Sequence, residues 1–399
     1  MRQASRQTSM KIGLYLQADG DAMGGSEYWL ACLAHGFGAR HEVTLLHHKP
    51  SLTVDRLASF SGHDLSAVVA SEALDEYPAA WWPYNPMPAV TARSRAFDLF
   101  VTITHRIPPA SAARCGALIV LFPLELTSRL WPWSDPDTQA SLHPRALMRR
   151  AHYAWLWKQR FASYRVRTAL STFAQRWVKR RWSVDTDVLY PPNDIAFPDV
   201  AKENTVISVG RFTTTTVSKA QAELVQLFRD RLDHGRGWSY QCLGQIGDAP
   251  ADREYFARVR TEARGHPIAV GGDVDREQLK QLMARSKIFW HAAGFDIDEE
   301  RAPHLCEHFG MVTVEAMAAG AVPVVIGRGG QREIVRHGID GFLCESLDEM
   351  AVQTQRLIDD GELWMRMSRS ARARAAEFSE ERSVQGLAQL VEASSAIRL

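Results

Sequence analysis

The chain has 399 residues, of which 46% are hydrophobic, with 47 lysines and arginines against 46 aspartates and glutamates and a formal net charge of +1. This length predicts two or three domains that each bury a core, and the ordinary charged and apolar fractions exclude a disordered chain. A net charge so close to zero also argues against a protein that coats nucleic acid through its overall field.

The first half of the chain alternates strand-like and helix-like patterns. Short apolar runs rich in Val, Ile and Leu, as in parallel strands buried on both faces, lie at residues 11–16, 42–47, 66–70, 98–103 and 117–122. A helical pattern at about 26–38 follows the first run. This alternation predicts a doubly wound α/β domain.

A strongly basic segment ends this half. Residues 145–181 contain eleven lysines and arginines and no acidic residue, interleaved with the aromatic residues Trp155, Trp157, Phe161, Tyr164 and Trp177. Three interpretations stay open: a solvated helix with its aromatic side chains in the core, a contact with a membrane or lipid-linked acceptor, and a contact with an anionic soluble acceptor or nucleic acid.

The second half repeats the alternation more clearly, after a hinge that Pro191 and Pro192 predict. Strand candidates lie at 205–210, 238–244, 267–272, 287–293 and 322–327, and helical patterns lie at about 218–232, 251–264, 275–285 and 311–319. The tail from about residue 347 is helical.

Together these patterns predict an α/β fold of two Rossmann-like, doubly wound domains that face each other across a cleft. We place the first domain at residues 1–190 and the second at 191–375. Residues 376–399 are expected to form a C-terminal helix that crosses back to the first domain.

The strongest chemical signal is the segment EHFGMVTVEAMAAG at 307–320, which is followed by VPVVIG and GGQREIV. The pattern begins a helix near Gly310, so Glu307 lies in the preceding loop and Glu315 in the second turn. Free backbone N–H groups at 310–313 can bind phosphate, and each carboxylate can accept two hydrogen bonds from a vicinal diol. A diol, a diphosphate and a second diol make up the layout of a nucleotide-sugar.

The segment from Glu307 to Val335 resembles the donor-site signature of family 4 retaining glycosyltransferases, which have the GT-B fold. Three further segments resemble the family: GGSE at 24–27, SVGRF at 208–212 with Ser218-Lys219, and KIFWHAAGFDIDEERAPHLCEHFG at 287–310. The resemblance implies that 1–190 is the acceptor-side domain and that 191–375 binds the nucleotide-sugar.

The resemblance also assigns roles to single residues. Arg211 and Lys219 would bracket the diphosphate and neutralise the leaving group. Gly24 and Gly25 would let the backbone approach the donor phosphate, and His105 would lie near the donor sugar and the acceptor. The predicted catalytic residues are His105, Arg211, Lys219 and Glu307. The predicted donor-binding residues are Gly24, Gly25, Arg211, Lys219, Val274, Glu307, Phe309, Gly310, Met311, Val312 and Glu315.

We expect no metal ion and no other cofactor in this reaction. Asp-x-Asp tripeptides would hold a divalent metal in a different glycosyltransferase fold, but loop composition explains those at 19–21, 135–137, 185–187, 273–275 and 296–298. Arg211, Lys219 and the helix N-terminus already supply the positive potential that a metal would provide.

The predicted function is that of a retaining glycosyltransferase with a metal-independent, front-face mechanism. It would move a hexose from GDP-mannose or a UDP-sugar to a hydroxyl group of a glycan or a lipid-linked glycan, and nucleic acid is not an expected partner. One alternative is a catalytically inert nucleotide-sugar-binding or scaffold subunit of the same fold. Another is a dinucleotide-dependent oxidoreductase, which would need a GxGxxG pattern that neither GGSE nor GRGG supplies. Leu121 and Leu170 depart from the family's pattern on the acceptor side.

The cysteines and the N-terminus bear on location. Cysteines at 32, 115, 242, 306 and 344 are odd in number and form no CxxC pair, so we expect neither a disulfide framework nor a zinc site. The first ten residues are polar and precede an apolar run too short for a signal peptide. We therefore expect a cytoplasmic protein, with a peripheral membrane contact through residues 145–181, at the inner face of the membrane, as an open hypothesis.

Overall fold

A computed structural model of the chain describes residues 9–18, 23–74, 87–123, 144–214, 217–232, 237–272 and 274–394. Contacts within the chain divide it into two units. The first comprises Met1–Pro192 together with Glu380–Leu399, and the second comprises Asn193–Ser379. The predicted boundaries fall a few residues earlier, after residues 190 and 375.

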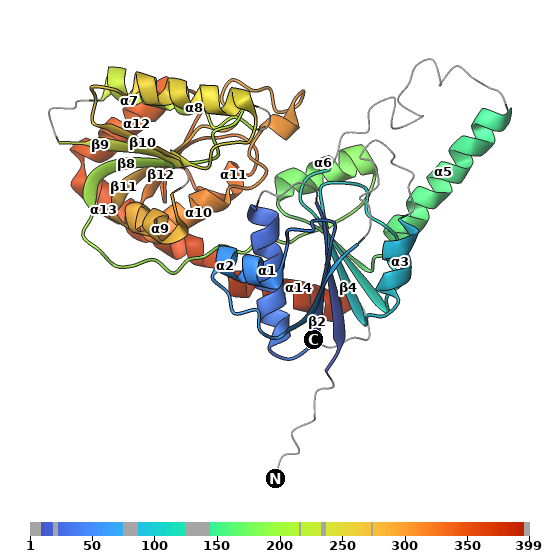
Figure 1. Ribbon diagram of the computed structural model, residues 1–399. Helices are drawn as coiled ribbons and strands as arrows, with labels where there is room; N and C mark the ends of the chain where they lie inside the picture. Colours follow the sequence, from blue (N-terminus) through green and yellow to red (C-terminus); the bar gives the residue numbers. More distant parts are fainter. Residues whose placement is uncertain are drawn as a thin grey trace, which may run out of the picture. The chain divides into compact units, whose positions relative to one another are not determined.

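The first unit is built on a seven-stranded parallel sheet with the order β3-β2-β1-β4-β5-β6-β7 (Figure 1). Its strands are β1 (Lys11–Gln17), β2 (Glu42–His47), β3 (Val68–Ala73), β4 (Leu99–Thr104), β5 (Cys115–Val120), β6 (Val166–Ala169) and β7 (Asp187–Val188). Its helices are α1 (Gly25–Gly38), α2 (Val54–Ser61), α3 (Pro88–Ser94), α5 (Pro144–Ala162), α6 (Thr172–Trp182) and α14 (Glu380–Ser394). The strands β4 and β5 are buried at every position, which explains their continuous apolar sequences.

The C-terminal helix α14 packs on α1 of the first unit. Leu387 and Val391 on α14 are fully buried. A Cβ atom on Gly36 of α1 would lie 2.8 Å from Val384, so the missing side chain lets the two helices approach closely. The Ser383 hydroxyl donates a hydrogen bond of 2.8 Å to the carbonyl oxygen of Tyr190. The last helix therefore belongs to the first unit, although its sequence follows the second.

The second unit is built on a six-stranded parallel sheet with the order β10-β9-β8-β11-β12-β13. Its strands are β8 (Glu203–Val209), β9 (Ser239–Gly244), β10 (Ile268–Gly272), β11 (Ser286–His291), β12 (Val322–Ile326) and β13 (Phe342–Cys344). Its helices are α7 (Gln221–Arg231), α8 (Pro250–Glu262), α9 (Arg276–Arg285), α10 (Met311–Ala319), α11 (Gln331–Ile334), α12 (Leu347–Asp359) and α13 (Gly361–Ala375). Two short 3₁₀ turns lie at Pro303–Leu305 and Ala376–Phe378.

Aromatic side chains between this sheet and its covering helices form the core of the second unit. Tyr240 stacks on Phe228 of α7 with ring centroids 5.5 Å apart and contacts Trp290 at 5.4 Å. Their polar atoms are paired, since the Trp290 indole donates to Thr354 of α12 at 2.8 Å and the Tyr240 hydroxyl lies 2.6 Å from the Ser208 hydroxyl. Large rings with satisfied polar atoms fix the helices on the sheet that carries the site.

The prediction of an α/β protein with two doubly wound sheets is confirmed, because every strand pair of the described residues is parallel and helices connect the strands. Within the described residues, no helix combines the length and apolar character that a bilayer crossing requires.

Candidate active site

The loops that carry the predicted donor-site residues leave the second sheet at its switch point. The chain proceeds from β8 outward to β9 and β10, and then from β11 outward to β12 and β13, while β8 and β11 are neighbours. The loop after β8 holds Arg211 and Lys219, and the loop after β11 holds Glu307. Ligands of open α/β sheets bind at such a point because the adjacent loops diverge there.

Lys219, His291 and Glu307 form a polar cluster at this point. The Lys219 Nζ atom donates a hydrogen bond of 2.6 Å to Oε2 of Glu307, and Nε2 of His291 donates to the same oxygen at 2.9 Å. The Glu307 side chain is 19% exposed and the Lys219 side chain 21%, whereas His291 is buried. The structure thus brings two of the predicted catalytic residues together and leaves both within reach of a ligand.

Neighbouring charge controls the protonation of Glu307 in this cluster, whereas burial controls that of His291. Burial alone raises the pKa of Glu307, but the Lys219 ammonium and the His291 hydrogen bond hold that pKa well below its usual range. Burial lowers the pKa of His291, and the hydrogen bond to Glu307 opposes this effect only in part. At neutral pH Glu307 is therefore a carboxylate and His291 a neutral imidazole.

The loop after β8 is shaped so that Lys219 and Arg211 lie near each other. A Cβ atom on Gly210 would lie 2.7 Å from Cγ of Lys219, and one on Gly244 would lie 1.9 Å from the Gly210 carbonyl oxygen. The buried Gln221 amide fixes the loop by donating to the carbonyl oxygens of Gly210 and Arg211, both at 3.1 Å. The half-buried Arg211 guanidinium has no hydrogen-bond or ion-pair partner within the described part of the chain. Its planar donors are available to an anion.

Helix α10 begins beside this cluster, as the sequence predicts. Its N-cap, Gly310, has φ 118°, a conformation that side-chain-bearing residues rarely adopt. Met311 and Val312 form the first turn and are half-buried, and their N–H groups have no acceptor inside the helix. Glu315 follows in the second turn, also half-buried. Two carboxylates thus flank a set of backbone N–H donors.

Lys202 and Arg372 donate hydrogen bonds to the carbonyl groups at the opposite end of α10. The Lys202 Nζ atom donates to the carbonyl oxygens of Ala319, at 2.8 Å, and Ser286, at 2.7 Å. Arg372 donates to the carbonyl oxygen of Ala318 at 3.3 Å. Burial lowers the pKa of Lys202 to about 7. These donors satisfy the last carbonyl groups of α10 and hold the helix in place.

Two glycines pack closely against the backbone of Glu307 and Phe309. Gly329 has φ 58°, and a Cβ atom there would lie 2.0 Å from the Glu307 carbonyl oxygen. A Cβ atom on Gly330 would lie 2.4 Å from Cα of Phe309, and the Gly330 N–H donates to the Glu307 carbonyl oxygen at 2.8 Å. Glu299 ties the same loop down by accepting from the Gly329 N–H at 3.2 Å. This loop needs glycine for close approach.

Gln331 is a buried polar residue at the same place that sequence reasoning missed. Its side chain is fully buried, and its Nε2 atom lies 2.6 Å from where a Cβ atom of Gly310 would be. Neither atom of its amide has a hydrogen-bond partner among the described residues. Because an unpaired buried amide is costly, these atoms are candidates for contact with a bound ligand or water.

The remaining predicted residues of the second unit lie at the edge of this arrangement. The Phe309 ring is buried against Phe378, with centroids 5.6 Å apart, so only its backbone is available to a ligand. Val274 lies between β10 and α9, two strands away from β8.

Only part of the Asp-x-Asp tripeptides can be placed, and two of the described carboxylates are held in ion pairs. Those at 19–21 and 135–137, and Asp273 of a third, lie outside the described residues. Asp185 pairs with Lys179 at 2.6 Å and Asp298 with Arg301 at 3.5 Å, so these two carboxylates take part in surface ion pairs.

The predicted residues of the first unit lie at the switch point of their own sheet. The strand order reverses between the neighbours β1 and β4. Gly24 caps α1 after β1, Gly25 is the first residue of that helix, and the exposed His105 directly follows β4. Each predicted residue of this unit therefore lies where an open α/β sheet binds ligands.

The turn at Gly24 depends on a buried ion pair that sequence reasoning also missed. The Glu27 carboxylate accepts hydrogen bonds from the Gly24 N–H and the Ser26 hydroxyl, both at 2.9 Å. The Lys49 Nζ atom lies 2.5 Å from its other oxygen, and both side chains are buried. The motif GGSE contains this glutamate, and a buried carboxylate always requires such partners.

Comparison with known proteins finds a family that the second unit resembles. Residues 193–374 match the family model of glycosyl transferases group 1. This segment includes Arg211, Lys219, Glu307 and Glu315. The second unit is thus similar to group 1 glycosyl transferases over nearly its whole length. Its polar cluster and the N-terminus of α10 both lie inside the matched segment.

Curated relatives of this chain are named for transfer to different acceptors. Over 221 residues, 51% of this chain, it is 25% identical to a Dictyostelium discoideum GDP-Man:Man(3)GlcNAc(2)-PP-Dol alpha-1,2-mannosyltransferase. Over 157 residues, 36% of this chain, it is 32% identical to a Geodermatophilus obscurus D-inositol 3-phosphate glycosyltransferase. The matched parts span 41% and 33% of the lengths of these relatives.

Solved structures extend the likeness of fold to the whole chain. The Anabaena Alr3699/HepE protein in complex with UDP and glucose superposes with a TM-score of 0.65 at 18% identity, covering 96% of this chain and all of the other. Sucrose-phosphate synthase from Thermosynechococcus elongatus superposes with a TM-score of 0.63 at 16% identity, covering 96% of this chain and 98% of the other. The chain has the same GT-B fold as these two structures.

Proposed function

We propose that the protein is a retaining glycosyltransferase that moves a hexose from a nucleotide-sugar to a hydroxyl group of a glycan or lipid-linked glycan. The observation that carries this proposal is the Lys219–Glu307–His291 cluster, which lies at the switch point of a group 1 domain. The relatives support the donor class: one is a GDP-mannose-dependent mannosyltransferase, and the Anabaena protein has been crystallised with UDP-glucose. GDP-mannose and UDP-glucose are therefore the first donors to test.

The charges of the site fit the parts of such a donor. Arg211 and Lys219 would hold the diphosphate, with the N–H groups of Met311 and Val312 at the α10 N-terminus as further donors. Glu307 would accept hydrogen bonds from hydroxyl groups of the sugar, and Glu315 from the ribose diol.

Transfer would proceed on one face of the sugar. The acceptor oxygen bonds to the anomeric carbon as the bond from that carbon to the phosphate oxygen breaks, and the acceptor proton passes to the departing phosphate oxygen. The products are a nucleoside diphosphate and a glycoside of retained configuration. Negative charge grows on the leaving group during this step, so Arg211 and Lys219 bind the transition state more strongly than the ground state. No metal is assigned to this step because these cations supply the needed charge.

Substitution of Glu315 tests the assignment of the donor site. A hydrogen bond to a charged group contributes roughly 1.5–3 kcal/mol, so Glu315→Ala should lower kcat/KM for the nucleotide-sugar by about ten- to a hundredfold. The measurement is release of nucleoside diphosphate across GDP- and UDP-sugars, with and without added Mg²⁺ or Mn²⁺. Unchanged donor use by Glu315→Ala would remove this residue from the site, and a strict need for added metal would refute the metal-independent step.

Calorimetric titration with UDP and GDP separates the alternatives. A nucleoside diphosphate that binds in the micromolar range while no sugar is transferred or hydrolysed would favour an inert donor-binding or scaffold subunit. Binding of NAD(P) with neither UDP nor GDP bound would favour an oxidoreductase. The cytoplasmic location at the inner face of a membrane stays part of our proposal for the active enzyme.

The basic segment is the proposed place of acceptor or membrane contact. Most of its aromatic side chains lie in the core: Phe161, Tyr164 and Trp177 are buried. Some of its cations stack on those rings, and the Arg180 guanidinium lies 4.8 Å from the centroid of Trp177. On α5, however, Met148 is 66% exposed and Trp155 55% exposed, one heptad apart and therefore on one face of the helix. An exposed apolar pair within a basic helix suits a lipid interface.

Vesicle binding tests this contact. The full chain should sediment with vesicles containing anionic lipid and stay in solution with neutral ones, and Trp155→Ser should weaken the binding. Binding that persists in Trp155→Ser at full strength, or equal binding to neutral vesicles, would refute a contact through this face.

A further inference from the structure

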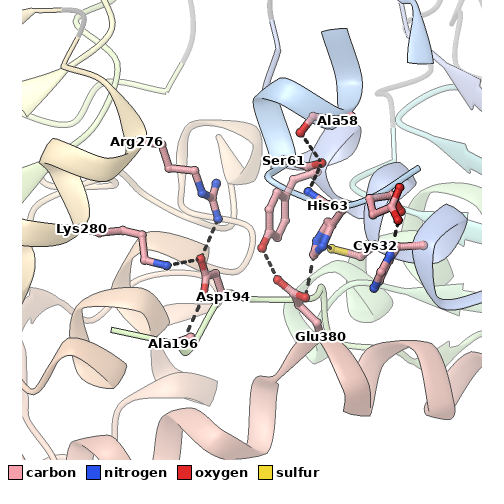
Figure 2. Close-up of polar contacts among 12 residues, drawn as sticks. Cys32, Ala58, Ser61, His63, Asp194, Ala196, Arg276, Lys280 and Glu380 are labelled. Carbon is pink, nitrogen blue, oxygen red and sulfur yellow. Dashed lines mark hydrogen bonds and ion pairs between the residues drawn. The ribbon is translucent and has the colours of Figure 1, made fainter. Parts of the chain in front are cut away.

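Three side chains of the first unit converge at a place that the transfer reaction does not use (Figure 2). Cys32 lies on α1, His63 follows α2, and Glu380 is the first residue of α14. Sγ of Cys32 lies 3.3 Å from Nε2 of His63, and that nitrogen lies 3.5 Å from Oε2 of Glu380. We propose that these three side chains bind a zinc ion that fastens α14 to the rest of the first unit.

Two of the separations among these three atoms are those of neighbouring ligands on one zinc ion. With Zn–S near 2.3 Å and Zn–N and Zn–O near 2.0–2.1 Å, tetrahedral geometry puts neighbouring ligand atoms about 3.3–3.6 Å apart. The two measured separations fall in this range, and all three atoms lie within 4.8 Å of one another. Among the described residues, these are the three Cys, His or acidic side chains whose ligand atoms lie close enough together to hold a metal ion.

The chemistry of the ligand set suits zinc. A cysteine thiolate and a glutamate carboxylate together neutralise the charge of Zn²⁺, and a neutral imidazole supplies the third ligand. Zinc accepts sulfur, nitrogen and oxygen ligands in one site, whereas Ca²⁺ and Mg²⁺ prefer oxygen alone.

The geometry does not fit a nucleophilic triad of cysteine, histidine and acid. In such a triad the thiol and the carboxylate contact opposite nitrogens of the imidazole. One nitrogen accepts the proton of the thiol, and the other donates a hydrogen bond to the carboxylate, which orients the ring. Here Cys32 and Glu380 both approach Nε2 of His63. Convergence on one point instead favours a shared ion.

Neighbouring groups hold these side chains in place. The Tyr28 hydroxyl donates a hydrogen bond to Oε1 of Glu380, the oxygen that does not face His63. The His35 ring stacks on His63 with centroids 5.0 Å apart. Such outer contacts orient metal ligands. A pocket of about 450 Å³, lined by Cys32, His35 and Glu380 among others, gives a water molecule access as the fourth ligand.

Zinc would have a structural role here, because its ligands are far apart in sequence and the ion would cross-link their segments. Cys32 and His63 come from the first part of the chain, whereas Glu380 comes from the helix that follows the second unit. The ion would therefore bind only the folded first unit and stabilise it, with α14 docked, in proportion to its affinity.

Metal analysis of the full chain is the first test. Protein purified without chelator and dialysed should retain about one zinc per chain. Reconstitution with Co²⁺ alone should give the near-ultraviolet charge-transfer band of a thiolate ligand together with the visible bands of a tetrahedral ion. Absence of bound zinc combined with no cobalt spectrum at saturating Co²⁺ would overturn the proposal.

Variants locate the ion. Cys32→Ser and Glu380→Gln should each lose the zinc, and Cys32→Ser the charge-transfer band, whereas Cys344→Ala, which changes a buried thiol of the second unit, should keep both. Zinc at a thousandfold excess over its Kd should raise the Tm of the wild-type chain by about 8 °C or more and slow amide hydrogen exchange in residues 380–394. The site would be refuted if zinc stayed bound in Cys32→Ser and Glu380→Gln, or if the rate of amide hydrogen exchange in α14 were the same with and without zinc. Since the cobalt spectrum and the exchange measurement use the wild-type chain, a misfolded variant leaves the test intact.

Discussion

Replacement of Lys219 by methionine tests the central contact of the proposed donor site. Its Nζ atom lies 2.6 Å from the Glu307 carboxylate, with about a fifth of each side chain exposed. At an effective dielectric constant of 20, unit charges at that distance attract by about 6 kcal/mol. Desolvation of both groups offsets most of this attraction. Lys219→Met should therefore lower the free energy of unfolding by about 2–3 kcal/mol, the cost of leaving a half-buried carboxylate with one donor fewer.

The same substitution should change the pH dependence of stability. In the wild type, Lys219 and His291 hold the pKa of Glu307 below its usual range, so ionised Glu307 stabilises the fold. That contribution is complete above the ordinary glutamate pKa of about 4.5 and is lost as the pH falls through the lowered value. Without Lys219 the pKa of Glu307 rises, so acid unfolding of the variant should begin at a higher pH.

Kinetics separate a catalytic role of Lys219 from a structural one. If the ammonium stabilises charge that grows on the leaving diphosphate, Lys219→Met should reduce kcat by about 100- to 1,000-fold and change KM far less. Arg231→Met is a matched control, because Arg231 lies at the same 2.6 Å from Asp348 but the pair is exposed. The control should keep its stability within about 0.5 kcal/mol and its turnover. A kcat of Lys219→Met within twofold of the wild type would refute the assignment.

Three further substitutions probe the same site. Arg211→Met should lower kcat/KM for the donor at least tenfold with an unchanged Tm, since the guanidinium has no partner among the described residues; a lowered Tm with normal kinetics would contradict this. Gln331→Met should raise the donor KM while leaving the Tm equal or higher, because an unpaired buried amide is removed; a normal KM would show that the amide does not contact the donor. Gly329→Ala should lower the Tm and abolish transfer, because its φ is 58° and its Cβ would meet the Glu307 carbonyl oxygen; circular dichroism melting and a transfer assay check both.

Buried parallel strands could be predicted from sequence because they read as continuous apolar runs. The strand predicted at 322–327 is observed as β12, Val322–Ile326, and the helix predicted at 311–319 has those bounds in the structure. The strands β6 and β13 were not predicted. The first has Arg167 in its centre and the second has only three residues, so neither gives a clear apolar pattern.

The site could be predicted where its residues form a local motif. Glu307 and Glu315 belong to one segment, and the structure places them on either side of the α10 N-terminus. His291 could not be identified in this way, because it reads as the end of a buried strand and meets Glu307 only through the path of the intervening loop. Gln331 was missed because a polar residue that follows two glycines and precedes Arg332 reads as an exposed turn. Cys32, His63 and Glu380 come together only through tertiary packing, which sequence spacing does not record.

The division of the chain has a consequence for its synthesis. All of the second unit has left the ribosome once Ser379 emerges, and this unit can then fold around its own sheet. The first unit, although its sequence begins the chain, waits for α14, which covers the apolar surface of α1. During that interval Cys32 and His63 lack Glu380. The N-terminal half of the protein is therefore the last to be completed, and a chain cut off near residue 379 would contain a complete second unit joined to an incomplete first unit.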